Sequence, residues 1–212
     1  MGASNRLFVL KNLACARGGR ALFQNLNLEA GAGDVVHLSG PNGAGKTSLL
    51  RALAGALPFE GEILWDGKNF LENGRTLHAA RYAFLPPDDR SLKVLETAYE
   101  NLTFWATLWN AAPVAVHGAL AQMGIEKLKE TPVRRFSAGQ KRRLSLARVL
   151  VKPAKLWLLD EPFNGLDTEA TALFDAALAR HVAAGGMAII ASHYPVHPPK
   201  GGRLSRLELG AA

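Results

Sequence analysis

Residues 34–56 of this chain read DVVHLSGPNGAGKTSLLRALAGA and combine three patterns in a row. Residues 34–38 form a compact apolar run, which predicts a strand, and residues 46–56 are rich in Leu and Ala, which predicts a helix. The segment from Gly40 to Thr47 fits the pattern G-x-x-x-x-G-K-[ST] and joins the two. In such a loop, backbone N–H groups converge on phosphate oxygens, and the helix N-terminus adds its positive dipole end. The stretch predicts an α/β fold with a phosphate-binding loop.

The residues of this loop have distinct expected roles. Lys46 would bridge the β- and γ-phosphates of a nucleotide and assist catalysis, and Thr47 would offer its hydroxyl to Mg²⁺. A glycine-rich turn with an accidental lysine is the competing interpretation, but the pattern arises by chance in on the order of one percent of chains of this length. The residues predicted to contact the nucleotide are Gly40, Pro41, Asn42, Gly43, Ala44, Gly45, Lys46, Thr47 and Ser48.

A second motif, LWLLDEP at residues 156–162, ends an apolar run with two acids. A buried strand of this kind would place Asp160 at the carboxyl edge of the sheet, beside the phosphate loop. There Asp160 can hold Mg²⁺ through water, and Glu161 can polarise an attacking water. Two exposed carboxylates at a strand end are the alternative. The phosphate loop earlier in the chain favours the metal and catalytic roles.

A third motif, FSAGQ at residues 136–140, begins a segment rich in Lys and Arg. Ser137 and Gln140 have the spacing of a capping box, which predicts a helix start. A capped helix N-terminus with small residues in its first turn is also an anion site. Both roles are compatible.

The rest of the chain favours one domain over residues 1–212. We expect an N-terminal antiparallel β part, a mixed sheet core, and a helical subdomain at about residues 92–150 inserted into the α/β core. In that subdomain, the aromatic stripe of Phe104, Trp105 and Trp109 is more typical of a core than of a ligand site, and an exposed edge where a partner docks is an equal alternative. The expected strands are residues 7–13, 21–28, 34–38, 62–65, 82–85, 156–159, 187–191 and 203–209, the last at an edge, and helices are expected at 46–56, 137–151 and 168–183.

The composition narrows the class of protein. The chain has 25 Lys and Arg against 18 Asp and Glu, a formal charge of +7, and residues 127–155 hold ten of the bases and one acid, Glu130. Such a block indicates nucleic acid, anionic lipid, a phosphorylated ligand, or only a solvated helix face. The single cysteine, Cys15, excludes a disulfide framework. No apolar stretch reaches the roughly 20 residues of a spanning helix.

In this order, the three motifs resemble those of the ATP-binding subunit of ABC transporters. The resemblance implies a P-loop NTPase of the ABC ATPase type that uses ATP and Mg²⁺. It also implies that Ser137, Gly139 and Gln140 contact the γ-phosphate held by a second copy, so that the ATP-bound state is a head-to-tail homodimer. The basic block surrounds this motif, and we therefore interpret it as the flank of a phosphate-bearing interface.

The same resemblance assigns further residues and exposes two departures. FNGLD at residues 163–167 would cross the dimer interface with Asp167, and His193 would orient water and sense the γ-phosphate. The family carries an aromatic residue that stacks on adenine, and here Arg17 occupies its place and would stack instead.

The second departure concerns a glutamine that the family carries after the strand expected at residues 82–85. No Gln occurs between residues 25 and 121. Pro87 falls at the expected position, and Asp88 or Asp89 would have to supply the missing oxygen. This leaves a degenerate nucleotide switch as one alternative.

Within the family, the chain looks most like the ATPases of cytochrome c biogenesis, on the strand EILW at residues 62–65, the motif SAGQ, and GGMAIIASHYP at residues 185–195. This implies a motor for haem export or haem-chaperone release, with integral membrane partners of the CcmB and CcmC type, at the cytoplasmic face of a bacterial inner membrane. We expect no bound haem, since C-x-x-C-H is absent, and no nucleic acid. A different ABC exporter, for lipid, drug or lipoprotein, and a soluble ABC ATPase acting on nucleic acid remain open.

Overall fold

The computed structural model describes residues 8–18, 20–69, 79–197 and 202–210, without the side chains of Arg17 and Arg20. The strands are β1 (Phe8–Arg17), β2 (Arg20–Ala30), β3 (Asp34–Ser39), β4 (Glu60–Trp65), β5 (Lys68–Asn69), β6 (Tyr82–Leu85), β7 (Leu156–Asp160), β8 (Met187–Ala191) and β9 (Arg203–Glu208). The helices are α1 (Lys46–Leu53), α3 (Ala98–Leu108), α4 (Val114–Gln122), α5 (Ala138–Val151) and α6 (Thr168–Ala183), with 3-10 turns η1 (Glu126–Leu128) and η2 (Val133–Arg135).

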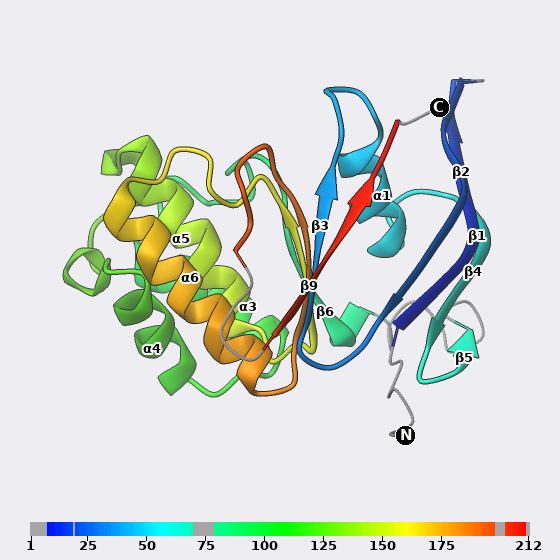
Figure 1. The fold of residues 1–212 in the computed structure, drawn as a ribbon. Coiled ribbons are helices and arrows are strands. Elements are labelled where there is room, and N and C mark those ends of the chain that lie inside the picture. Colours follow the sequence, from blue (N-terminus) through cyan, green and yellow to red (C-terminus); the bar gives the residue numbers. More distant parts are fainter. Residues whose placement is uncertain (1–7, 19, 70–78, 198–201, 211–212) are drawn as a thin grey trace.

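The strands form two sheets. One sheet is parallel, in the order β6-β7-β8-β3-β9, and the other is antiparallel, in the order β2-β1-β4-β5. Strands β7 and β8 are buried at every residue, as continuous apolar runs in a parallel sheet require. The antiparallel sheet and α1 lie on one side of the parallel sheet, and α3, α4, α5 and α6 lie on the other (Figure 1).

Two hydrophobic clusters hold these layers together. Val36, Ile189 and Leu158 face α1 and the antiparallel sheet, with Phe8 and Leu10 opposite them. The alternate residues of the same strands face the helices on the other side. Because successive side chains of a strand point to opposite faces, each central strand contributes to both clusters. The expected fold class is confirmed, with parallel pairing in one sheet and antiparallel pairing in the other.

Most predicted elements are present, and their bounds differ by a few residues. Strands β6 and β8 and helix α6 have the expected bounds, and β9 lies at the sheet edge as predicted. Helix α1 ends at Leu53, three residues before the predicted end, because Gly55 turns the chain with a φ of +69°. The extent of the single domain and of the helical subdomain stays a prediction. No helix in the described ranges has the length and apolarity needed to cross a bilayer.

Of the two interpretations of the aromatic stripe, the structure favours an exposed edge over a buried core. Phe104 is 44% exposed, and Trp105 and Trp109 are half-buried and stacked on each other at 5.0 Å between ring centroids. Lys93 Nζ lies 3.7 Å from the Phe104 ring centroid, and Lys152 Nζ lies 5.0 Å from that of Trp109. An ammonium group over the face of an aromatic ring stabilises that ring at the surface. The helical spacing of the aromatic residues does not reveal such contacts.

The interpretation of the basic block also needs correction. Arg142 and Arg148, both on α5, are only 3% and 5% exposed. They face inward, where β6 and the segment after it supply carbonyl and side-chain oxygens as acceptors. These two bases therefore belong to the interior of the molecule and not to a solvated flank.

Candidate nucleotide-binding site

The predicted phosphate loop joins β3 to α1. Gly45 is the N-cap of α1 with a φ of +98°, so Lys46 and Thr47 stand in the first turn of the helix. Gly40 has a φ of +133°, and a Cβ there would lie 2.3 Å from the carbonyl oxygen of Leu209. Only glycine fits at Gly40, because both the backbone conformation and the neighbouring chain exclude a side chain.

Lys46 is folded back over the loop that precedes it. Its ammonium is largely buried, and Nζ donates hydrogen bonds to the carbonyl oxygens of Gly40 at 2.6 Å and Pro41 at 3.1 Å. An ammonium carries three N–H donors, so one remains for a further acceptor. The site therefore holds a positive charge that is ready for an anion.

Asp160 ends β7 beside this helix turn and is 2% exposed. Burial raises the pKa of its carboxyl, and a hydrogen bond with the Thr47 side chain opposes that rise. Its Oδ2 has no hydrogen-bond partner among the described residues. A hydroxyl and an unpaired buried carboxylate oxygen are hard oxygen ligands, so Thr47 and Asp160 fit a Mg²⁺ ion.

Glu161 follows with a left-handed backbone, at a φ of +48°. Its Oε2 accepts a hydrogen bond from the His193 backbone N–H at 3.3 Å, and its Oε1 lies 3.4 Å from His193 Nε2. The Glu161 side chain is 13% exposed, and that of His193 is 50% exposed. A largely buried carboxylate that is held by its neighbour and borders the cavity can accept a proton from a bound water.

These groups surround one cavity of about 530 Å³. The lining combines a helix N-terminus, one ammonium and two carboxylates, which suits a phosphate chain with a divalent cation. Three further residues line it: Pro87, which falls at the position of the missing glutamine, Asn164, which belongs to the FNGLD motif, and Leu22, which no local pattern marks. The predicted residues in the lining are Asn42, Gly43, Gly45, Lys46, Thr47, Ser48, Asp160, Glu161 and His193.

Comparison with known proteins decides the family. The ABC transporter family model matches residues 23–164. A cytochrome c biogenesis ATP-binding export protein CcmA from Paramagnetospirillum magneticum is 45% identical over 201 residues, 92% of each chain. The protein of the same name from Pseudomonas putida is 42% identical, over 93% of this chain and 94% of the relative. This chain belongs to the CcmA-like ABC ATPases.

Solved structures agree on the fold. An ATP-binding subunit of an ABC transporter has a TM-score of 0.83 at 21% identity and covers 97% of this chain and 88% of that chain. A putative ABC transporter ATP-binding protein from Pyrococcus furiosus has a TM-score of 0.81 at 22% identity, over 95% of this chain and 96% of that chain. As an ABC ATPase, the chain binds and hydrolyses ATP.

In this ABC ATPase the predicted capping box at the start of α5 is present. Ser137 Oγ accepts from the Gln140 backbone N–H at 3.2 Å, and Gln140 Oε1 accepts from the Ser137 N–H at 2.9 Å. Gly139 packs against the backbone of Gly165, since a Cβ there would lie 3.0 Å from its carbonyl oxygen. The three motif residues, Ser137, Gly139 and Gln140, lie outside the lining of the chain's own cavity.

Further predicted residues also lie outside this lining, namely Gly40, Pro41 and Ala44 of the phosphate loop and Asp167. Asp167 is the N-cap of α6, where Oδ1 accepts from the Ala170 N–H at 2.7 Å, and it pairs with Arg143 at 2.8 Å. Its role across a dimer interface stays a prediction. Arg17 ends β1, and its side chain lies outside the described part of the chain, so its stacking on a base stays a prediction too.

The segment after β6 departs from the expectation for Asp88 and Asp89. Asp89 Oδ1 accepts from Ser145 Oγ at 2.6 Å and so faces α5, away from the cavity. Asp88 pairs with Arg90 at 3.4 Å on the surface. Pro87 alone of the three lines the cavity. Neither acid therefore supplies the missing glutamine oxygen in this arrangement.

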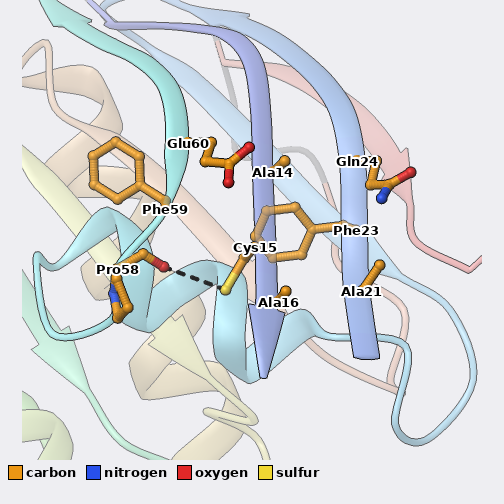
Figure 2. A pocket seen from close by; sticks show the side chains of 9 residues that line it. All are labelled: Ala14, Cys15, Ala16, Ala21, Phe23, Gln24, Pro58, Phe59 and Glu60. Atoms are coloured by element: carbon orange, nitrogen blue, oxygen red, sulfur yellow. Dashed lines mark hydrogen bonds between the residues drawn. The ribbon is translucent and has the colours of Figure 1, made fainter. Parts of the chain in front are cut away.

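A smaller pocket of about 250 Å³ lies beside the β1–β2 hairpin (Figure 2). The Cys15 thiol points at the Pro58 carbonyl oxygen, 3.5 Å away, with the Phe23 ring beside it. Burial raises the pKa of Cys15, which keeps the thiol protonated and unreactive. Among the lining residues Glu60 alone carries a charge, so the pocket offers nothing to a phosphate.

Proposed function

We propose that this chain is the Mg²⁺-dependent motor subunit of a membrane complex for cytochrome c biogenesis, where ATP hydrolysis drives haem export or haem-chaperone release. The observation that carries the ATPase part is the meeting of Lys46, Thr47, Asp160, Glu161 and His193 around one cavity. The cytochrome c part is supported by the names of relatives that share 40–45% of their residues with most of this chain.

Each residue has a role that follows from its position. Lys46 binds the β- and γ-phosphates with the donor that its loop leaves open. Thr47 and Asp160 would hold Mg²⁺, which when bound neutralises phosphate charge. Glu161 accepts a proton from the attacking water, and His193, in contact with both Glu161 carboxylate oxygens, keeps that carboxylate oriented.

The proposed active state is a homodimer in which each cavity is completed by the other copy. Ser137, Gly139 and Gln140 lie outside their own cavity, yet Ser137 and Gly139 begin a helix of 14 residues. A helix N-terminus of this length attracts a negative phosphate. We infer that it contacts the γ-phosphate of the second copy, with Asp167 near the same interface.

The proposed partners are integral membrane subunits of the CcmB and CcmC type, with the ATPase bound peripherally at the cytoplasmic face of a bacterial inner membrane. The relatives are named export proteins, and export across a bilayer needs subunits that span it. We propose no direct haem binding and no nucleic-acid binding by this chain.

The test is ATP turnover and partner identity in the complex purified from membranes through a tag on this chain. Lys46→Ala should lower phosphate release roughly a hundredfold or more, because a preorganised cation on the phosphates is lost. Lys68→Ala, at an exposed lysine on β5 outside the cavity lining, is the matched control and should leave the rate unchanged. Unchanged turnover in Lys46→Ala would contradict the phosphate role.

Mass spectrometry of the co-purified subunits tests the rest of the proposal. We expect membrane proteins of cytochrome c assembly, and loss of mature cytochrome c in cells that carry Lys46→Ala. Lipid, drug or lipoprotein exporter subunits in their place would leave the ATPase assignment and overturn the haem role.

A further inference from the structure

The side chain of Arg142 joins three parts of the molecule that are far apart in the chain. From α5 it reaches the end of β7, where Nη2 donates to the carbonyl oxygens of Asp160 at 2.8 Å and Glu161 at 2.6 Å. Its Nη1 donates to the carbonyl oxygen of Pro86 at 3.0 Å and lies 3.5 Å from Asp89 Oδ1. One guanidinium therefore ties the segment after β6 to the two acids of the cavity.

These hydrogen bonds surround a residue with an unfavourable backbone conformation. Glu161 has a φ of +48°, a left-handed conformation that a residue other than glycine adopts only when its surroundings impose it. The Glu161 N–H donates to the Ala191 carbonyl oxygen at 2.8 Å, and Arg142 binds the Glu161 carbonyl oxygen on the other side of the residue. The peptide groups on both sides of Glu161 are thereby fixed, and with them the direction of its carboxylate.

The Arg142 side chain is itself buried and held by a carboxylate. It is 3% exposed, and burial lowers its pKa while the Asp89 carboxylate acts in the opposite direction. Asp89 Oδ1 also accepts a hydrogen bond from Ser145 Oγ at 2.6 Å, which fixes it against α5. The neighbouring Pro87 lines the cavity, so the anchored segment forms one cavity wall.

An ordinary buried ion pair that only holds helix to sheet is the competing interpretation, and the chain contains an example for comparison. Arg148 lies on the same helix and is 5% exposed. Its partners are the Ser91 hydroxyl and the Phe84 carbonyl oxygen. Among the described residues it makes no hydrogen bond to Asp160 or Glu161. The two arginines are therefore matched in burial and charge and differ in their contact with the site.

We propose that Arg142 is a positioning residue for ATP hydrolysis, which acts through the backbone of Asp160 and Glu161 and is held in place by Asp89. This inference rests on the proposed function. In this role Arg142 does not touch a reacting atom. Its loss should therefore misdirect the Glu161 carboxylate and leave the phosphate loop and Lys46 intact.

The first test compares Arg142→Lys with Arg148→Lys in the complex with its membrane subunits. Lysine keeps the charge, but a single ammonium cannot reproduce the fork that reaches both the β7 end and the Pro86 segment. We expect Arg142→Lys to lower kcat about tenfold or more, since a small misplacement of a catalytic group is costly. KM for ATP and the affinity for a fluorescent ATP analogue should stay within about threefold, because binding groups are untouched. Arg148→Lys should keep kcat within about threefold of the parent.

Equal effects of the two lysine substitutions, or a loss of nucleotide affinity parallel to the loss of kcat, would overturn the positioning role. Lys46→Ala separates this outcome from failure of the proposed function. If Lys46→Ala abolishes turnover while the two arginine variants behave alike, the ATPase stands and only this inference falls.

A second variant tests the proposal without changing Arg142, so that the result does not depend on how well an Arg142 variant folds. Asp89→Asn retains an acceptor for Ser145 and removes the charge that holds the guanidinium. We expect a smaller loss of kcat with unchanged nucleotide affinity. The double variant Asp89→Asn/Arg142→Lys should be no slower than Arg142→Lys alone, since residues that act as a unit are not additive. Losses that multiply, or an unchanged kcat in Asp89→Asn, would contradict the proposal.

Discussion

Asp160 shows how the site stores unfavourable energy in one residue. Its carboxyl is 2% exposed with one oxygen unpaired among the described residues, and burial raises its pKa. A carboxylate that is taken out of water without a full set of donors lowers the stability of the fold. A cation bound between Asp160 and Thr47 would relieve this cost. Asp160 therefore lowers the stability of the ligand-free fold and raises the affinity for the cation.

Asp160→Asn should therefore stabilise the nucleotide-free protein. Asparagine can keep the acceptor for Thr47 and carries no charge to bury, so we expect Tm near pH 7 to rise by about 2–4 °C for each kcal/mol recovered. A pKa that is raised in the folded state means that the ionised carboxyl costs stability, and this cost fades as protonation begins. The gain should shrink as the pH falls towards about 4. Thermal melts with and without Mg²⁺ and ATP check this: a lower Tm, or an intact Mg²⁺-dependent shift, would contradict it.

At the scale of elements, the start of α5 combines two roles in Ser137. Its hydroxyl caps the helix through the Gln140 N–H, and the same helix end is proposed to face the phosphate of a second copy. The capping role and the proposed phosphate contact of Ser137 can be tested separately, because other side chains cap a helix equally well.

Ser137→Asp should retain stability and lose activity. Aspartate is as good an N-cap as serine, so Tm should stay within about 2 °C of the parent. Its charge would repel the γ-phosphate in the dimer, and ATP turnover of the complex should fall by roughly tenfold or more. Ser137→Ala is the control, with the cap lost and no charge added. If Ser137→Asp turns over ATP at the parent rate, the helix end does not face a phosphate.

At the scale of the whole molecule, the motif residues that match the family are divided between the cavity and a site outside it. Lys46 and Glu161 line the cavity, and Ser137 and Gly139 do not. A single chain therefore offers the groups for binding the phosphates from one side only. In the proposed homodimer, the second copy would supply the rest.

Glu161→Gln should accumulate the ATP-bound dimer. The amide keeps the size of the side chain but cannot take the proton from water, so hydrolysis stops after the dimer has closed. Size-exclusion chromatography with light scattering should show dimer with ATP and Mg²⁺ and monomer without them. The Lys46→Ala/Glu161→Gln double variant should remain monomeric under both conditions. Monomer alone in Glu161→Gln with ATP and Mg²⁺ would contradict the sandwich mechanism.

The elements with strong local patterns could be predicted closely. The run at residues 187–191 and the helix at 168–183 match β8 and α6, because burial on both faces and helical spacing leave a clear pattern. The sequence could not decide whether the aromatic stripe is core or exposed edge, since a ring covered by a cation has the same helical spacing as a buried one. Leu22 in the cavity wall had no motif to mark it.

The amino-acid sequence alone determined the phosphate loop, the acid pair that ends β7 and the family, because each rests on residue types at short spacing. Only the tertiary structure decided which distant residue anchors the acid pair. Arg142 lies 56 residues from Pro86 and 19 from Glu161, and its bonds to both arise only when β6, α5 and β7 pack together. The same packing turns Asp89 away from the cavity and puts two bases of the basic block inside. Spacing governs local backbone geometry, whereas the partner of a buried charge depends on which distant segments the core brings into contact.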